Sequence, residues 1–313
     1  METTVKLSSD KKRYRPDQNA GWIYKMIKTE DKTMADLKTP FRYDYVGSFL
    51  RPANLKAARE GFENGKISAY ELKAVEDKEI ERLINKQKEL GYHVITDGEF
   101  RRATWHLDFM WGFDGVAHEK TKTGLPFHGE DAMIDDTYLC GKVGLSKVHP
   151  FVEHFKFVKQ FEDENTVAKQ TIPAPAQFIE QMIMPFALEN TSKYYDSTHK
   201  LAEDIANGYK KVIADLYDAG CRNLQLDDCS WGMLVDPRAE ELFGTDKKGL
   251  KNIQELLVEI NNLAIEDKPN DMTITTHVCR GNFHSTYAST GAYDSVAEVL
   301  FEKENVDAYY LEF

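Results

Sequence analysis

Two patterns of apolar residues alternate along the chain. Before Gly220, apolar side chains recur every three or four positions, as on the buried face of a helix. They are Leu201, Ile205, Tyr209, Val212, Ile213 and Leu216. Asn223–Asp227 instead predicts a short buried strand, and Leu250–Leu263 returns to the helical period. Strands that alternate with helices predict a parallel sheet with helices outside it.

Start and stop signals mark further helices. Ala53–Glu63 predicts a helix that breaks at Gly65. Ser68–Glu71 has the sequence of a capping box, in which the two side chains satisfy free N–H groups at a helix start. We expect a long helix from there to Gly91, because glycine is common just after a helix end. Ser295–Glu298 predicts a second capping box.

Seven segments are typical of strands, because they are short and bounded by turn-forming residues. They are Arg42–Ser48, His93–Asp97, Tyr138–Leu145, Thr166–Ile172, Asn223–Asp227, Met272–His277 and Ala308–Phe313. Seven successive strand–helix units favour an α/β fold of the (β/α)₈ TIM-barrel type over an open sheet. An eighth strand is not evident. We predict one barrel domain over residues 39–313, incomplete at its C-terminal side, and a flexible N-terminal extension over residues 1–38.

Composition narrows the class of protein. The 313 residues are 42% apolar, which is enough for a sizeable core. The 52 acidic and 40 basic residues give a net charge of −12, which disfavours nucleic acid and anionic membranes as partners. No apolar run approaches the roughly 18 residues of a membrane span, and the N-terminus has no apolar signal core. We therefore expect a cytoplasmic protein.

The four cysteines do not have the spacing of a disulfide framework. We expect Cys140 and Cys221 to be buried thiols. Cys229 and Cys279 follow predicted strands, where a thiol is available for chemistry.

Polar residues follow five of the predicted strands. The segments are Gly47-Ser48, Asp97-Gly98-Glu99, Asp227-Asp228-Cys229, His277-Val278-Cys279 and Glu312. Barrel enzymes carry their chemistry at the C-terminal ends of the strands. These five segments therefore predict one polar rim.

His277 and Cys279 form the sharpest candidate site. Residues i and i+2 of an extended chain point to the same side, so the imidazole and the thiol can face one metal ion. Zn²⁺ takes nitrogen and sulfur ligands, and Glu312 on the next strand offers an oxygen. The alternative is that these are unrelated core or surface residues.

Three further positions each have two interpretations. Asp227 and Asp228 follow a buried strand, and carboxylates there bind an ammonium group or cap the following helix. Glu99 has the same ligand-binding reading, or it pairs with a neighbouring arginine. Gly47-Ser48 presents an N–H and a hydroxyl to a carboxylate, or forms a simple turn.

Together these segments resemble the catalytic barrel of cobalamin-independent methionine synthase, and in particular its short single-barrel relatives. The resemblance covers residues 40–313. It rests on Tyr45–Pro52, Thr96–Glu99, Gln225–Asp228, His277–Cys279 and Tyr309–Glu312. It implies a methyltransferase that uses Zn²⁺ to hold a small thiol as a thiolate, homocysteine above all, and gives methionine.

The resemblance also implies roles for individual residues. Three of them look like zinc ligands: His277, Cys279 and Glu312. Four look like the groups that hold the amino-acid end of homocysteine: Gly47, Ser48, Glu99 and Asp227. The methyl donor would be a methylated folate or a methylated corrinoid protein. The family's fourth ligand, a cysteine on the eighth strand, has no counterpart in this sequence, nor has its folate-stacking tryptophan near Ile172–Pro175.

Two other functions fit the same pattern. One is a barrel enzyme similar to uroporphyrinogen decarboxylase, which needs no metal. The other is a non-catalytic zinc- or thiol-binding relative of the synthase. Zinc content separates the first from a methyltransferase, and methylation of a thiol separates the second.

Overall fold

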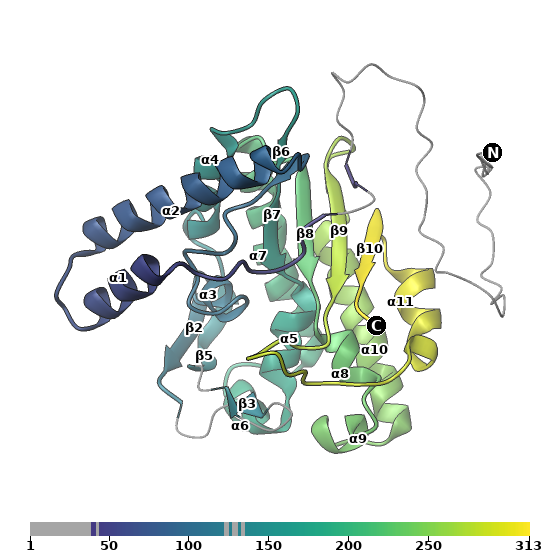
Figure 1. The fold of residues 1–313 in the computed structure, drawn as a ribbon. Coiled ribbons are helices and arrows are strands. Elements are labelled where there is room, and N and C mark those ends of the chain that lie inside the picture. The colour runs from purple at the N-terminus through teal and green to yellow at the C-terminus, as the bar shows by residue number, and fades with distance from the viewer. Residues whose placement is uncertain (1–38, 42–43, 122–124, 127–130, 133–134) are drawn as a thin grey trace, which may run out of the picture.

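A parallel sheet forms the centre of the protein. The computed structural model describes residues 39–41, 44–121, 135–313 and the backbone of 125–126 and 131–132, so the predicted extension lies outside the described residues. Four strands pair in chain order, as Figure 1 shows. They are β7 (Gln170–Pro173), β8 (Asn223–Asp227), β9 (Thr273–Val278) and β10 (Ala308–Leu311). A further parallel pair, β1 (Val94–Ile95) and β6 (Val167–Ala168), adjoins them through the short step from β6 to β7.

The predicted strands of this sheet are confirmed at four places. Asn223–Asp227 is a strand at the predicted bounds. The strand predicted over Met272–His277 is shifted by one residue, and the one predicted from Ala308 ends two residues earlier than predicted. The run Thr166–Ile172 is divided at Lys169 into two shorter strands. Parallel register brings the carboxyl ends together, since Asp227 pairs with His277 and His277 with Tyr310.

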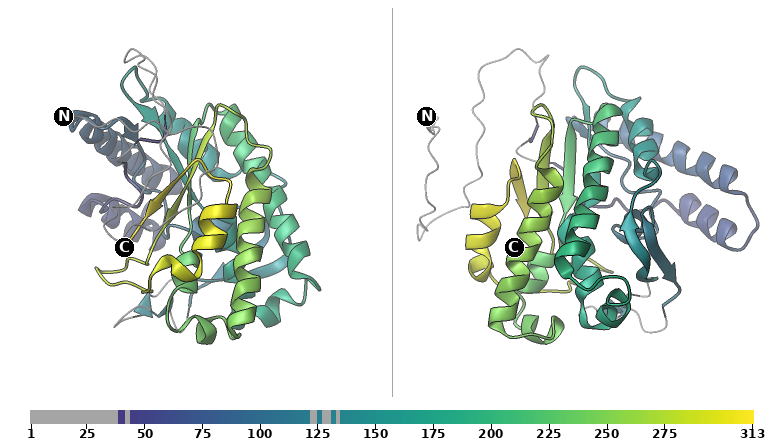
Figure 2. Two further views of the ribbon diagram at one scale, coloured as in Figure 1. Left: turned by 90° about the vertical axis from the view of Figure 1, so that its right-hand side faces the viewer. Right: turned by 180° about the vertical axis from the view of Figure 1, so that it is seen from behind.

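Three helices cover one face of the sheet. They are α5 (Pro175–Ile183), α7 (Thr198–Asp218) and α10 (Lys247–Ile265), and they pack against one another (Figure 1, Figure 2). The apolar positions predicted for α7 are all buried. The core therefore lies between the sheet and these helices, as the alternating pattern predicts.

A helical hairpin projects from the body of the protein (Figure 1). It consists of α1 (Ala53–Glu63) and α2 (Ala69–Glu89). The capping box at Ser68 is confirmed, because its side chain accepts from the Glu71 N–H while Glu71 accepts from the Ser68 N–H. Gly91 follows the helix with a φ of 80°, a conformation that favours glycine.

Shorter elements complete the described structure. The helices are α3 (Leu107–Met110), α4 (Pro150–Lys159), α6 (Pro185–Thr191), α8 (Ser230–Leu234), α9 (Ala239–Leu242), the 3₁₀ helix η1 (Tyr293–Ser295) and α11 (Ala297–Lys303). The strands are β2 (Asp114–Glu119), β3 (Leu125–Pro126), β4 (Asp131–Ala132) and β5 (Asp136–Gly144). Among the described residues, no helix has the length and apolar character needed to span a membrane.

Two of the seven predicted barrel strands are wrong. Residues 44–48 form no strand, because side chains rather than a neighbouring backbone bind the carbonyls of Tyr45 and Val46; residues 42–43 are outside the described part. The segment Tyr138–Leu145 does lie in a strand, but β5 pairs antiparallel with β2, outside the parallel sheet. The fold is therefore mixed α/β, and the described strands do not close into a barrel.

Two smaller predictions also fail. The capping box at Ser295–Glu298 does not form, because η1 ends at Ser295 and moves the helix start to Val296. Cys140 is exposed on β5, where the alternation of the strand turns it outward, whereas Cys221 is buried as expected.

Candidate active site and metal centre

Three side chains of the types that ligate metal ions meet where β9 and β10 end. His277 lies in β9, Cys279 follows that strand, and Glu312 follows β10. One ligand atom from each residue lies within 4.8 Å of the other two. Backbone N–H groups hold two of the side chains, from Arg280 to Glu312 Oε2 at 2.9 Å and from Gly281 to Cys279 Sγ at 3.1 Å. Extended backbone and parallel register thus bring together residues 35 positions apart in the sequence, from 277 to 312.

The imidazole of His277 is oriented by a carboxylate. Its Nδ1 lies 3.0 Å from Asp227 Oδ1. Its Nε2 is buried and has no hydrogen-bond partner among the described residues, and Glu312 Oε1 is 3.6 Å away. Burial disfavours the charged ring, but the interactions with Asp227 and Glu312 outweigh burial and raise the pKa of His277 to about 10. The atom that faces Glu312 therefore attracts a positive species, a proton or a metal ion.

These donors fit a zinc ion. Nitrogen, sulfur and carboxylate oxygen are the ligands that Zn²⁺ takes in proteins, and bonds of about 2.0–2.3 Å place tetrahedral ligands about 3.3–3.8 Å apart. His277 Nε2 and Glu312 Oε1 already have this spacing at 3.6 Å, and the three ligand atoms all lie within 4.8 Å of one another. A carboxylate on the far nitrogen of a ligating histidine, as Asp227 provides, is a common support for such a site.

A second thiol lies against Cys279. The Cys229 side chain, at the start of α8, shares a hydrogen bond with Cys279, which lowers the pKa of Cys279. The same contact, together with burial, raises the pKa of Cys229 well above its usual value. The two opposite shifts favour Cys229 as the donor of this pair and Cys279 as the acceptor. Cys229 is outside the group of three potential ligands.

The two consecutive carboxylates after β8 have different environments. Asp227 faces the metal-binding group, and its Oδ2 is buried without a hydrogen-bond partner in the described part of the chain. Asp228 points the other way, where its side chain accepts from the Ser230 N–H at 3.1 Å and from Asn261 at 3.0 Å. Asp228 thus fulfils the capping interpretation, and the interpretation as a ligand-binding group remains for Asp227.

Glu99 occupies a strained position below the same rim. Its φ of 60° lies in the left-handed region, which a residue other than glycine rarely adopts. Its Oε2 accepts from Ser48 Oγ at 2.5 Å, and its Oε1 accepts from Thr171 Oγ1 at 3.1 Å and faces Arg102 at 3.2 Å. Burial raises the pKa of Glu99. The pairing of Glu99 with an arginine is therefore confirmed, and its interpretation as a ligand-binding group stays a prediction.

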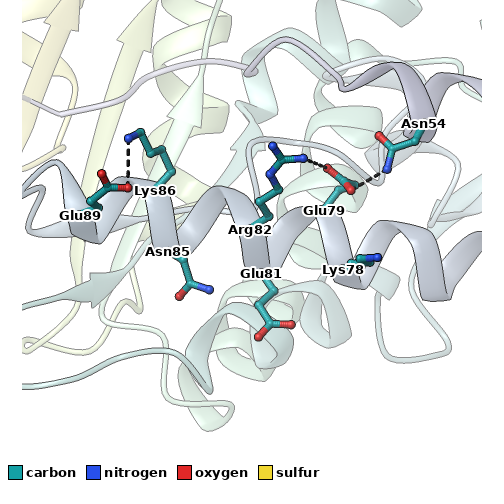
Figure 3. A pocket seen from close by; sticks show the side chains of 8 residues that line it. All are labelled: Asn54, Lys78, Glu79, Glu81, Arg82, Asn85, Lys86 and Glu89. Carbon is teal, nitrogen blue, oxygen red and sulfur yellow. Dashed lines mark hydrogen bonds and ion pairs between the residues drawn. The ribbon is translucent and has the colours of Figure 1, made fainter.

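A groove among the described residues lies elsewhere. It has a volume of about 820 Å³ and is formed by Asn54 of α1 and seven residues of α2, as Figure 3 shows. Several of its polar groups are paired with one another: Glu79 accepts from Asn54 at 2.6 Å and faces Arg82 at 3.9 Å, and Lys86 pairs with Glu89 at 3.0 Å. This groove is a solvated helix surface and contains none of the strand-end residues.

Several polar residues of the site were missed by the sequence analysis. Lys169 donates to Gln225, Gln225 donates to Asp227, and Thr171 donates to Glu99. The signal for Lys169 was available, because a charged residue inside the predicted strand Thr166–Ile172 needs a buried partner. Arg102 was not missed, since it is the neighbouring arginine that the pairing interpretation of Glu99 predicted.

Comparison with known protein families supports the resemblance. The profile of the family described as cobalamin-independent synthase, catalytic domain, matches residues 42–123. The uncharacterized protein YxjH of Bacillus subtilis is 39% identical over 283 residues, which are 90% of this chain and 73% of YxjH.

Solved structures give the same picture. The "Putative Vitamin-B12 Independent Methionine Synthase" from Listeria monocytogenes is 38% identical, with a TM-score of 0.69 over 89% of this chain and 74% of that protein. A B12-independent methionine synthase from Shewanella sp. W3-18-1, in complex with selenomethionine, is 19% identical with a TM-score of 0.53, over 77% of this chain and 64% of that one. At that identity the second likeness shows the fold alone.

Proposed function

Since the chain belongs to the cobalamin-independent methionine synthase family, we propose that it is a zinc-dependent methyltransferase whose acceptor is the thiol of homocysteine. The observation that carries the proposal is the set of donors at the ends of β9 and β10. A buried ring nitrogen of His277 faces Cys279 and Glu312 with no hydrogen-bond partner in the described structure. Zn²⁺ bound there would supply positive charge that favours the thiolate form of a substrate thiol.

The protein's own residues would bind the amino-acid end of the acceptor. The open Oδ2 of Asp227 is a buried negative group suited to an ammonium. Ser48, now bonded to Glu99, would turn its hydroxyl to the substrate carboxylate beside the N–H of Gly47, and the freed Glu99 oxygen would take a second ammonium proton. Holding the acceptor at both ends aligns its sulfur for attack, which supplies much of the rate by orientation.

The product side is supported by a relative. The Shewanella methionine synthase of similar fold holds selenomethionine, the selenium analogue of the product proposed here. The methyl donor would be a methylated folate or a methylated corrinoid protein. Either would deliver the methyl group to the sulfur from the rim side of the sheet.

Replacement of Cys279 by serine tests the proposal. We expect Cys279→Ser to remove most bound zinc and nearly all transfer of the methyl group to homocysteine, because the site loses its only sulfur ligand of the three. Zinc is measured by elemental analysis and methionine by mass spectrometry, with methylfolate and methylcorrinoid protein as donors. Cys140→Ser, which changes an exposed cysteine on β5, is the control.

The same experiment separates the two other candidate functions. Full methyl transfer by a metal-free protein would contradict zinc dependence. A protein that binds no zinc and methylates no thiol would favour a decarboxylase-like enzyme. Zinc binding without methylation by either donor would favour a non-catalytic zinc- or thiol-binding protein.

A further inference from the structure

A buried lysine lies in the interior beneath the candidate site. Lys169 stands between β6 and β7 with its side chain fully buried. Its Nζ lies 2.8 Å from Asp44 Oδ2 and 2.9 Å from Gln225 Oε1, and it also donates to the carbonyl of Tyr45. Three acceptors from two segments of the chain, residues 44–45 and β8, thus meet at one ammonium group.

The lysine fixes the orientation of the Gln225 amide. An ammonium group has only donors, so the oxygen of the amide must face it and the NH₂ group must face away. The NH₂ group then donates to the Val46 carbonyl at 2.7 Å and to Asp227 Oδ1 at 2.5 Å. With its amide reversed, Gln225 would place an oxygen against both of these acceptors.

Asp227 connects the oriented Gln225 amide to the residues at the strand ends. Its Oδ1 accepts from Gln225 and also contacts His277 Nδ1, which leaves Oδ2 as the open oxygen. A continuous set of polar contacts therefore runs from Lys169 to the imidazole at the candidate metal centre.

The same contacts hold the segment that carries Ser48. Residues 44–48 are in no strand, so a backbone ladder does not fix them. Instead, Lys169 binds the carbonyl of Tyr45 and Gln225 binds that of Val46, two residues and one residue before Gly47. The Ser48 hydroxyl then reaches Glu99 Oε2 at 2.5 Å. The position of this hydroxyl thus depends on the side chains of Lys169 and Gln225 rather than on pairing with a neighbouring strand.

Stability alone is a poor explanation for this lysine. Burial lowers the pKa of Lys169 and raises that of Asp44, so burial penalises both charges even though each partner favours the other. A buried ion pair is often no more stabilising than apolar residues of similar volume. A role in fixing the geometry of neighbouring groups accounts for the pair better.

We propose that Lys169 is a positioning residue, which orients Asp227 through Gln225 and holds the Gly47-Ser48 turn over Glu99. The proposal rests on the proposed function, because it assigns the positioned groups to recognition of the amino-acid end of the acceptor. Lys169 itself touches neither the acceptor nor the metal centre.

The test replaces Lys169 by methionine, which keeps the length and removes the ammonium. We expect the KM for homocysteine to rise by about 10- to 100-fold, the usual effect of losing a supporting contact, with a smaller change in kcat at saturating thiol. Amide hydrogen exchange of the peptide over residues 44–50 should also become faster. Asp44→Asn with Lys169→Met removes both charges together and should show the same two effects if the single variant folds poorly.

Lys268→Met is the matched control. Lys268 also pairs with an aspartate, Asp307 at 3.1 Å, and binds a backbone carbonyl, that of Met272, but at the opposite end of β9. We expect it to lower the melting temperature without changing the KM for homocysteine or hydrogen exchange at residues 44–50.

The outcomes separate this proposal from the proposed function. Loss of melting temperature in Lys169→Met with an unchanged KM and unchanged exchange at residues 44–50 would show a purely structural role and overturn it. If the unaltered protein neither binds zinc nor methylates homocysteine, the proposed function fails. Hydrogen exchange at residues 44–50 still decides whether Lys169 holds the turn, and no acceleration there would overturn the positioning role.

Discussion

The open oxygen of Asp227 should decide whether the site accepts an amino acid. Asp227→Asn keeps the shape of the side chain and removes its charge. The asparagine oxygen can still accept from Gln225 and His277, which places its NH₂ group where Oδ2 now stands. A donor would then face the ammonium of homocysteine in place of an acceptor.

The expected loss follows from the burial of this oxygen. Hydrogen bonds to a charged partner contribute about 1.5–3 kcal/mol, and removal of one partner from a buried charged pair costs about 3–5 kcal/mol. Asp227 is only 4% exposed, which places it toward the upper range. A loss of about 3–4 kcal/mol corresponds to roughly 10²- to 10³-fold weaker binding of homocysteine.

The assay compares two acceptors by calorimetry. Homocysteine and 4-mercaptobutyrate share the thiol and the carboxylate, but the second has no amino group. At saturating zinc, which compensates for weaker support of His277, Asp227→Asn should weaken homocysteine binding and leave 4-mercaptobutyrate binding nearly unchanged. Asp236→Asn, at a buried carboxylate with both oxygens already paired, should alter neither. An equal loss for both acceptors would refute the assignment of Asp227 to the ammonium.

Two further predictions concern buried titrating groups. Burial and the nearby Asp228 carboxylate raise the pKa of Glu304 to about 8, above the usual value of about 4.3, so the folded state binds the extra proton. The free energy of unfolding should therefore fall between about pH 5 and pH 8 by roughly 1–2 kcal/mol per pH unit. Glu304→Gln should remove this pH dependence in urea unfolding, and equal pH dependence in the variant and the unaltered protein would contradict the prediction. Because the Cys229 thiol lowers the pKa of Cys279, Cys229→Ala should move iodoacetamide alkylation of Cys279 in the metal-free protein to higher pH. An unmoved profile would show that Cys229 does not support the thiolate.

The local sequence pattern predicted those elements whose burial does not depend on which other element they pack against. The helical period before Gly220 was enough for α7, since any sheet it covers buries the same apolar face. The short segment Asn223–Asp227 was enough for β8, in which every residue is buried. Pattern failed for Tyr138–Leu145, because alternation is the same whether a strand pairs in parallel or in a hairpin such as β2–β5.

From the sequence, the candidate site could be predicted only as far as which side chains point to the same side of an extended segment. Spacing placed His277 and Cys279 together, and parallel register adds Glu312 beside them. Spacing also left Asp227 and Asp228 equivalent, and only the structure shows that Asn261 and Ser230 take the second carboxylate. Their roles as ligands and substrate-binding groups remain predictions.

The buried atoms at the strand ends that lack a hydrogen-bond partner among the described residues indicate the chemistry of the ligand. Contacts from Lys169 through Gln225 occupy one oxygen of Asp227 and leave the other. Asp227 in turn occupies one nitrogen of His277 and leaves the other facing Cys279 and Glu312. The open oxygen of Asp227 is suited to a cationic hydrogen-bond donor. The open nitrogen of His277 is suited to a metal ion, which would bind a further ligand. A thiol without an amine satisfies only the metal side, and an amino acid without a thiol satisfies only the carboxylate. A small amino-acid thiol satisfies both, which is why selectivity for the amine and retention of zinc should be lost through different substitutions.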